Sequence, residues 1–246
     1  MPTTADNPKC FAEVDDCRIL DWSLQALEHN RTEPLGRDQV CFVGGYQIER
    51  VQQDYPEFTF RHNADWQNNN ILLSLFHAED LMESGFICMY SDILFTKTIV
   101  GDLLASDADI SLAVDTGWLA RYEHRTDHPP DDAEKVTVRD GQVTSISRDI
   151  EQADAYGEFT GVARFTAAGA AQLREHFHRC REAYAGQPWG GPRVFEKAYM
   201  IQLFDEMLTQ GVPMTHLDTP GGYIEIDTQQ DFQYARDYWS SRHQDK

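Results

Sequence analysis

GFICMYSDILF, residues 85–95, is the stretch of sequence that decides the fold. It starts at a glycine and is largely apolar apart from Ser91 and Asp92, which is typical of a strand buried on both faces. In open α/β sheets the carboxyl ends of the strands border the ligand crevice. We therefore expect Asp92 at a ligand site, as a candidate metal ligand. The alternative is that Asp92 caps a helix that follows the strand.

Helical and strand patterns alternate around this stretch. Apolar residues recur at helical spacing within 18–30, and QVCFVGGY, residues 39–46, is a short apolar run that suits a buried strand. The elements predicted before residue 116 are helices at 18–30, 70–80 and 98–105 and strands at 39–46, 85–95 and 109–115. This alternation favours an α/β fold with a mostly parallel sheet.

The second half of the chain begins with a different pattern. Residues 134–148 alternate polar and apolar side chains around Asp140-Gly141, a strong signal for a two-residue hairpin, so we predict an antiparallel excursion. Residues 118–133 are polar, aromatic and proline-containing, which predicts a loop or lid. The remaining predicted elements are strands at 158–165 and 223–227 and helices at 168–184, 194–210 and 229–240.

Composition limits the class of protein. The chain has 246 residues, 41% of them hydrophobic, so it can bury a substantial core; we expect one domain, 1–246, with a lid and hairpin subregion at 118–165. Its net charge of −20 argues against nucleic-acid binding, which needs a basic patch. No long apolar run or leader pattern appears, so we expect a cytoplasmic protein with no membrane partner. The five scattered cysteines suggest neither a disulfide framework nor a zinc site.

A second pair of carboxylates lies near the other predicted strand end, in Glu225-Ile226-Asp227. Strand alternation puts Glu225 and Asp227 on one face. Carboxylates from two strand ends suit Mg²⁺, which takes one or two protein oxygens and fills its other positions with phosphate and water oxygens. The competing explanation is that Asp92 and Asp227 are helix caps.

Several other residues are binding candidates. Lys9 follows Pro8 near the start and has the charge to neutralise a phosphate, although a lone lysine is usually solvated surface. Asn69 and Asn70, with Ser74, form a polar cluster at a predicted helix start, where one helix cap accounts for only one of the amides. Gly45-Tyr46 follows a strand, which indicates either close backbone approach to a ligand or a turn.

Together these motifs resemble those of the sugar-phosphate and choline-phosphate nucleotidyltransferases, most closely the cytidylyltransferases that activate phosphocholine or phosphonates. The resemblance runs in order along nearly the whole chain. Its segments are Pro2-Thr3-Thr4 through Asn7-Pro8-Lys9 to Glu13-Val14, Gly45-Tyr46, Asn68-Asn69-Asn70-Ile71 with Ser74, Ser91-Asp92-Ile93-Leu94-Phe95, Lys135-Val136, Gly141-Gln142-Val143 with Ile146-Ser147-Arg148, Gly157-Glu158-Phe159-Thr160-Gly161-Val162, and Glu225-Ile226-Asp227-Thr228 with Asp231.

The resemblance implies a Rossmann-like, three-layer nucleotidyltransferase fold of the GT-A kind, with a mixed, mostly parallel sheet. It also implies roles for residues. Asp92 and Asp227 would hold Mg²⁺, and Lys9 and Lys135 would be catalytic, facing the nucleotide phosphates or the acceptor. The residues implied to line the nucleotide or acceptor pocket are Gly45, Tyr46, Asn69, Asn70, Ser74, Glu158 and Arg148, the last standing where some relatives carry lysine.

The implied reaction is attack by a phosphate or phosphonate oxygen of a small acceptor on the α-phosphorus of an NTP, with CTP favoured, and release of pyrophosphate. Alternatives are a catalytically silent binding or regulatory domain and a sugar-1-phosphate nucleotidyltransferase. If the acceptor carries an ammonium, the candidates for a cation–π cage are Trp66, Trp118, Tyr122, Trp189 and Tyr199. We also consider a homodimer.

One departure from the family pattern lies at the front of the chain. The family opens with a strand and a Gly-x-Gly-x-Arg loop that cradles the triphosphate, whereas the match here begins at Pro2. We therefore expect either that the true start lies upstream of Met1 or that this is a shortened form that folds poorly, oligomerises or has lost catalysis.

Overall fold

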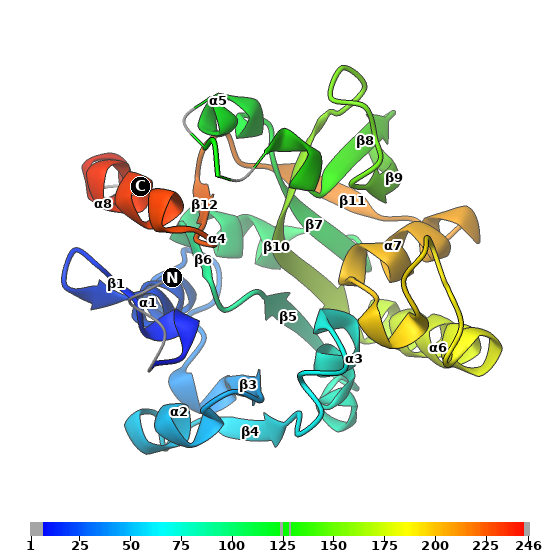
Figure 1. The fold of residues 1–246 in the computed structure, drawn as a ribbon, viewed down its shortest axis with the longest axis horizontal. Helices are drawn as coiled ribbons and strands as arrows, with labels where there is room; N and C mark the ends of the chain where they lie inside the picture. The colour runs from blue at the N-terminus through cyan, green and yellow to red at the C-terminus, as the bar shows by residue number, and fades with distance from the viewer. Residues whose placement is uncertain (1–6, 124, 128, 244–246) are drawn as a thin grey trace.

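Two adjacent buried strands, β7 (Ile110–Asp115) and β10 (Gly157–Thr166), form the centre of the largest sheet. Every residue of β7 is buried, as expected for a strand covered on both faces. A computed structural model describes residues 7–123, 125–127 and 129–243 (Figure 1). The part of the resemblance carried by Pro2-Thr3-Thr4 lies outside the described residues.

The largest sheet has six strands in the order β5-β10-β7-β11-β9-β8, and three two-stranded sheets accompany it. The strands are β1 (Glu13–Val14), β2 (Cys17–Arg18), β3 (Cys41–Gly44), β4 (Thr59–His62), β5 (Gly85–Met89), β6 (Ile93–Phe95), β7, β8 (Lys135–Arg139), β9 (Gln142–Ser147), β10, β11 (Thr215–Asp218) and β12 (Tyr223–Glu225).

Helices cover both faces of this sheet. The α-helices are α1 (Ile19–Glu28), α2 (Ile48–Asp54), α3 (Ile71–Phe76), α4 (Lys97–Ala105), α5 (Trp118–Tyr122), α6 (Ala167–Tyr184), α7 (Met200–Thr209) and α8 (Gln229–His243). Short 3₁₀ helices span Lys9–Phe11, Arg37–Gln39, Glu79–Leu81, Pro130–Asp132 and Phe195–Lys197. Helices α6 and α7 lie together on one side of the sheet (Figure 1).

Side-chain alternation along β7 separates two hydrophobic cores. Leu112 and Val114 pack in the cluster that includes the buried residues of α6 and α7. Ala113, between them, packs in the cluster formed with α1 and α4. Because neighbouring residues of a strand point to opposite faces, the sheet is the middle layer of three. The predicted α/β, three-layer architecture is confirmed.

The predicted hairpin is confirmed as β8–β9, with Asp140 at φ 51° and Gly141 at φ 76°. Two consecutive left-handed residues are the requirement of the tight hairpin turn that fits twisted strands.

The sheet is mixed, as expected, but the prediction that it is mostly parallel is wrong. In the six-stranded sheet the one parallel pair among the described residues is β7–β11; β3 and β4 form another parallel pair apart from it. The physical reason is β10, a strand of 10 residues that pairs antiparallel with β5, β7 and β8.

Three element boundaries also differ from the predictions. The stretch 85–95 is two strands, because the chain turns at Tyr90–Asp92 and β6 pairs with β12 instead of joining the large sheet. Residues 118–133 are not only a loop, since α5 buries Trp118 and Tyr122. Helix α7 begins at Met200, six residues after the predicted start.

Within the part of the chain that the structure describes, no helix is both long and apolar enough to cross a membrane.

Candidate functional site

Lys9, Asp92 and Asp227 meet at one point. Asp92 lies in the turn between β5 and β6, and Asp227 follows β12. The amide of Ile226 donates to the carbonyl of Asp92 at 3.0 Å, which holds the two segments together. The Lys9 ammonium donates to Asp92 Oδ2 at 2.8 Å and also to Asp227 Oδ1. The fold thus brings Lys9 into contact with Asp92, 83 positions further along the chain, and with Asp227, 218 positions further along.

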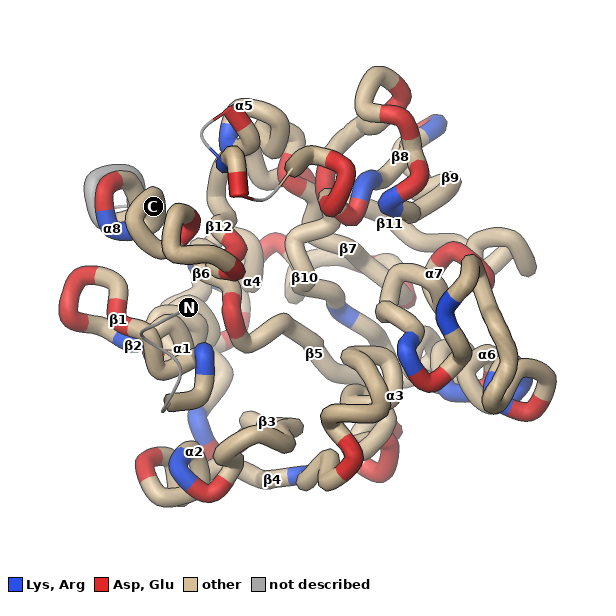
Figure 2. The backbone as a smooth tube through the Cα atoms, viewed as in Figure 1, with Lys and Arg blue, Asp and Glu red and all other residues tan. Residues whose placement is uncertain are grey.

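This trio is accessible and charged. The side chains of Lys9, Asp92 and Asp227 are 32%, 26% and 35% exposed. Burial works against the Lys9 charge, but Asp92 and then Asp227 outweigh it, so that the pKa of Lys9 is raised above its ordinary value. In Figure 2, acidic stretches of the backbone lie beside β6 and β12 and a basic stretch lies near the N-terminus.

The donor chemistry of the trio fits Mg²⁺. Two carboxylates already converge on a single cationic atom, the Lys9 nitrogen, and hard carboxylate oxygens are what Mg²⁺ selects. The alternative explanation for Asp227 is that it caps a helix. At the start of α8, however, Thr228 and Asp231 form the cap. Asp231 Oδ2 accepts from the amide of Thr228 at 2.8 Å, and the amide of Asp231 donates to Thr228 Oγ1 at 3.1 Å, a reciprocal cap at the start of α8.

A buried ion network supports this region. Arg121 pairs with Asp115 and, at 2.5 Å, with Glu158, and Tyr122 donates to the other Glu158 oxygen at 2.7 Å. Glu158 is 3% exposed and has both carboxylate oxygens bonded inside the protein. It therefore lies in the interior, where its charge is matched by Arg121, and its predicted place in the nucleotide or acceptor pocket stays a prediction.

Glu225, the neighbour of Asp227, belongs to a second buried pair. Arg125 bonds Asp231 at 2.6 Å and approaches Glu225 at 3.8 Å. Burial first, and then the charges of Asp227 and Asp92, raise the pKa of Glu225 well above its ordinary value. Protonation of Glu225 relieves repulsion in a cluster of carboxylates.

Lys135, the second predicted catalytic lysine, is 3% exposed. Its amine lies against the carbonyl oxygens of Pro130, Asp131 and Ala133, at 3.4 to 3.5 Å. Burial lowers its pKa below the ordinary value. Among the described residues, no hydrogen bond of Lys135 reaches Asp92 or Asp227; the structure does not bring it to the Lys9 cluster.

Arg148 lies beside a glutamate that the sequence did not single out. Its NH2 group donates to Glu134 Oε1 at 3.4 Å, and Tyr90 donates to Glu134 Oε2 at 3.1 Å. Burial raises the pKa of Glu134 to about 7, although the Arg148 guanidinium opposes the shift. Arg148 also lies over the ring of Tyr199, with Cζ 4.2 Å from its centroid.

The amide cluster is held by internal contacts. Asn70 caps α3 by accepting from the amide of Ile71 at 2.9 Å, and Asn69 exchanges side-chain hydrogen bonds with Asn63 at 2.7 and 2.9 Å. Asn63 also donates to Ser74 at 2.8 Å. Asn63 is 1% exposed and lies outside the run of three asparagines, so the sequence carries no signal for its place in this cluster.

Gly45 and Tyr46 are placed by a packed tryptophan. A Cβ at Gly45 would come 2.4 Å from Trp66, so close packing accounts for this glycine. Tyr46 meets Trp66 edge to face, with ring centroids 5.6 Å apart, and is 44% exposed. Of these two, Tyr46 presents a surface to solvent.

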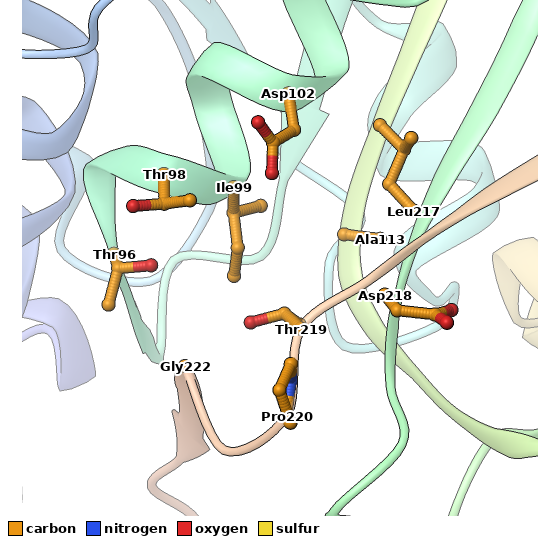
Figure 3. Close-up of a pocket in the computed structure, with 10 residues that line it drawn as sticks. All are labelled: Thr96, Thr98, Ile99, Asp102, Ala113, Leu217, Asp218, Thr219, Pro220 and Gly222. Atoms are coloured by element: carbon orange, nitrogen blue, oxygen red, sulfur yellow. The ribbon is translucent and has the colours of Figure 1, made fainter.

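A cavity of about 160 Å³ lies away from these residues, between α4, β7 and the connection from β11 to β12 (Figure 3). Its charged lining residues, Asp102 and Asp218, are acidic. An acidic lining repels phosphates, and none of the predicted site residues contributes to it.

Comparisons with known proteins agree with this fold. No protein-family model matches the chain. The CTP:phosphoglutamine cytidylyltransferase of Campylobacter jejuni is 22% identical, over 95% of this chain and 92% of that protein. The inositol-1-phosphate CTP transferase of T. maritima superposes with a TM-score of 0.66 at 20% identity, over 94% of this chain and 84% of that one. The CTP:phosphocholine cytidylyltransferase of Streptococcus pneumoniae superposes with a TM-score of 0.70 at 15% identity, over 97% and 92%. The resemblance and the nucleotidyltransferase fold are confirmed.

Proposed function

We propose that this chain, which shares the fold of the sugar-phosphate and choline-phosphate nucleotidyltransferases, is a Mg²⁺-dependent cytidylyltransferase. It transfers CMP from CTP to a small phosphorylated or phosphonate acceptor and releases pyrophosphate. The observation that carries the proposal is the convergence of Lys9, Asp92 and Asp227 on one point. The similarity of nearly the whole chain to a cytidylyltransferase supports it.

In the proposed reaction an acceptor oxygen forms a bond to the α-phosphorus of CTP while the bond from that phosphorus to the bridging oxygen of pyrophosphate breaks. Negative charge builds up on the leaving group and on the α-phosphate. Little covalent work is left to the protein, whose tasks are positioning and charge stabilisation.

Asp92 and Asp227 would hold Mg²⁺. When bound, the ion would act as a Lewis acid and neutralise charge on the phosphate oxygens. While Lys9 is bound to them, the two carboxylates raise its pKa. A charged ammonium near the site offsets the repulsion between a triphosphate and a chain of net charge −20.

Lys9 contributes a second cation that can change partners. Its side chain is 32% exposed, and a lysine has a flexible stem and a compact charge. With a metal ion held by Asp92 and Asp227, the Lys9 ammonium would be available to the nucleotide phosphates. We therefore assign phosphate contact to Lys9. The catalytic role predicted for Lys135 stays a prediction.

The test is pyrophosphate release from each of the four NTPs with Mg²⁺. The acceptor panel is phosphocholine, phosphorylated glutamine, inositol 1-phosphate, 2-aminoethylphosphonate and glucose 1-phosphate. We expect turnover with CTP and a non-sugar acceptor. Turnover with another base and a sugar phosphate would favour a sugar-1-phosphate nucleotidyltransferase, and silence with folded protein would favour a binding domain.

Asp92→Asn and Asp227→Asn should each lower kcat at least 100-fold without unfolding the protein. The matched control is Asp80→Asn, which changes a 60% exposed aspartate paired with Arg61 at the surface and should leave kcat unchanged. Direct Mg²⁺ titration of the nucleotide-free protein gives an independent readout. Retention of wild-type turnover and Mg²⁺ affinity by both site variants would refute the metal assignment.

A homodimer and a cytoplasmic location remain predictions. Light scattering of the purified protein tests the first, and cell fractionation tests the second.

A further inference from the structure

Two arginines gather around one aromatic ring, that of Tyr199. Arg148 Cζ lies 4.2 Å and Arg193 Cζ 4.8 Å from the centroid of the Tyr199 ring. Arg193 also donates to the Tyr199 hydroxyl. Two like charges around one ring repel each other, so the arrangement needs an anion or another compensation.

Arg193 is not compensated by a carboxylate. Among the ion pairs formed by the described residues, none includes Arg193. Its guanidinium instead bonds the Tyr199 hydroxyl and lies against the Tyr199 ring. Arg148 has two long ion pairs, with Glu134 at 3.4 Å and with Asp132 at 4.0 Å, and its Nε is buried and has no hydrogen-bond partner among the described residues.

The loop that carries Arg193 is anchored to the start of α7. The amide of Trp189 donates to the carbonyl of Arg193 at 3.0 Å, and Pro188 and Val194 form a β-bridge. Gln202 donates to the carbonyl of Trp189 at 2.8 Å. Trp189 itself is 7% exposed. The fold thus fixes the backbone that presents Arg193 to Tyr199.

Short chains of contacts connect the Tyr199 ring to the segment that carries Asp92 and to the amide cluster at the start of α3. On one side Arg148 contacts Glu134, which accepts from Tyr90 at 3.1 Å, two residues before Asp92. On the other side Asn70 donates to the carbonyl of Lys197 at 3.2 Å, two residues before Tyr199.

The aromatic residues considered for an ammonium-bearing acceptor are mostly buried or already in contact with other side chains. Trp118, Tyr122 and Trp189 are buried in the protein, and Trp66 packs against Tyr46. Tyr199 already contacts two cations of the protein. A trimethylammonium group would have to displace a guanidinium and approach a second one, whereas a carboxylate would bind both by charge-assisted hydrogen bonds.

We infer that Arg148 and Arg193, held around Tyr199, bind a carboxylate at the end of the acceptor remote from its phosphate, an inference that rests on the proposed function. The acceptor is then a phosphorylated carboxylic acid or amino acid and not a phosphorylated quaternary amine. Arg148 and Arg193 are specificity-determining residues, since they touch the acceptor away from the reacting atoms.

The experiment uses O-phosphoserine and O-phosphoethanolamine, which differ by one carboxylate. Isothermal titration of each into the protein with Mg²⁺ and CMP should give at least tenfold tighter binding of phosphoserine. Arg193→Met should weaken phosphoserine binding about 10- to 100-fold, the range for a hydrogen bond to a charged group, and change phosphoethanolamine binding less than twofold. Arg179→Met, which changes an exposed arginine paired with Glu206, should change neither.

Two outcomes overturn the inference. One is phosphoethanolamine or phosphocholine binding at least as tightly as phosphoserine. The other is equal weakening of both ligands by Arg193→Met, which would place the arginine on the acceptor phosphate. Arg148 is tested with two variants. Arg148→Met removes a partner of buried Glu134 and can affect folding, so Arg148→Lys, which keeps the positive charge, is measured with it. Pyrophosphate release by the same samples tests the proposed function separately: a binding preference without turnover refutes the proposed function alone, and turnover without the preference refutes the inference alone.

Discussion

Replacement of Glu134 by glutamine should remove a large part of the pH dependence of stability. Glu134 is 7% exposed and accepts hydrogen bonds from Tyr90 at one carboxylate oxygen and from Arg148 at the other, of which the single oxygen of a glutamine can keep one. Burial raises its pKa from an ordinary 4.5 to about 7, against the opposing influence of Arg148. The folded protein therefore binds this proton more tightly than the unfolded chain, so the stabilisation is fully present below pH 4.5 and is lost as the pH rises through about 7.

One pKa unit corresponds to about 1.4 kcal/mol, so Glu134 should make the wild-type protein less stable at pH 8 than at pH 5 by about 2–3 kcal/mol. Urea unfolding at the two pH values measures this difference. In Glu134→Gln it should be smaller by about 2–3 kcal/mol, because the variant has no group to ionise there. The exposed Glu151→Gln is the control and should keep the wild-type difference. Identical pH dependence in wild type and Glu134→Gln would show that Glu134 ionises at no cost and refute the reasoning.

Two further predictions concern the buried parts of the fold. Arg125→Met should lower the free energy of unfolding by about 3–5 kcal/mol in urea, because it leaves the fully buried Asp231 without its arginine; a loss below 1 kcal/mol would contradict this. Gly161→Ala should lower the melting temperature more than Gly141→Ala. Both glycines have positive φ. A Cβ at Gly161 would come 2.4 Å from the Tyr90 ring, whereas a Cβ at Gly141 would have no atom within 4 Å. Equal shifts in the two variants would show that Tyr90 moves freely.

Local signals in the sequence predicted the elements that local physics determines. The β8–β9 hairpin followed from Asp140-Gly141, and β7 from an apolar run. The predicted helix start at 194 was wrong, because tertiary contacts decide it. Pro188 and Val194 form a β-bridge, and the amide of Tyr199 donates to the side-chain oxygen of Gln202 at the helix start. Helix α7 therefore begins only at Met200.

Short or polar elements escaped prediction for a different reason. Strands β4 (Thr59–His62) and β11 (Thr215–Asp218) have no fully buried residue, so they carry little hydrophobic pattern. They are strands because β3 and β7 offer them parallel partners. The pairing depends on residues far away in the chain, which periodicity does not report.

The residues of the candidate site also fall into two groups, those that the sequence predicts and those that it does not. Lys9, Asp92 and Asp227 were found through motif order and strand ends, and the structure brings them together. Glu134 and Arg193 had no such signal, because a lone glutamate or arginine in a polar segment looks like solvated surface. Only their contacts with Arg148 and Tyr199 reveal them.

The exposure of the cations distinguishes the Lys9 cluster from the buried ion network and supports the proposal that an exchangeable ion binds at the Lys9 cluster. Arg121 and Arg125 neutralise their carboxylate partners with side chains that are 5% and 2% exposed. Their departure would leave buried charges unpaired, at a cost of several kcal/mol. Lys9 is 32% exposed and contacts two partly exposed carboxylates, so water can take over its solvation when it leaves. The same chain therefore fixes arginines at its buried carboxylates and places a partly exposed lysine at Asp92 and Asp227, where Mg²⁺ would take its place in the function we propose.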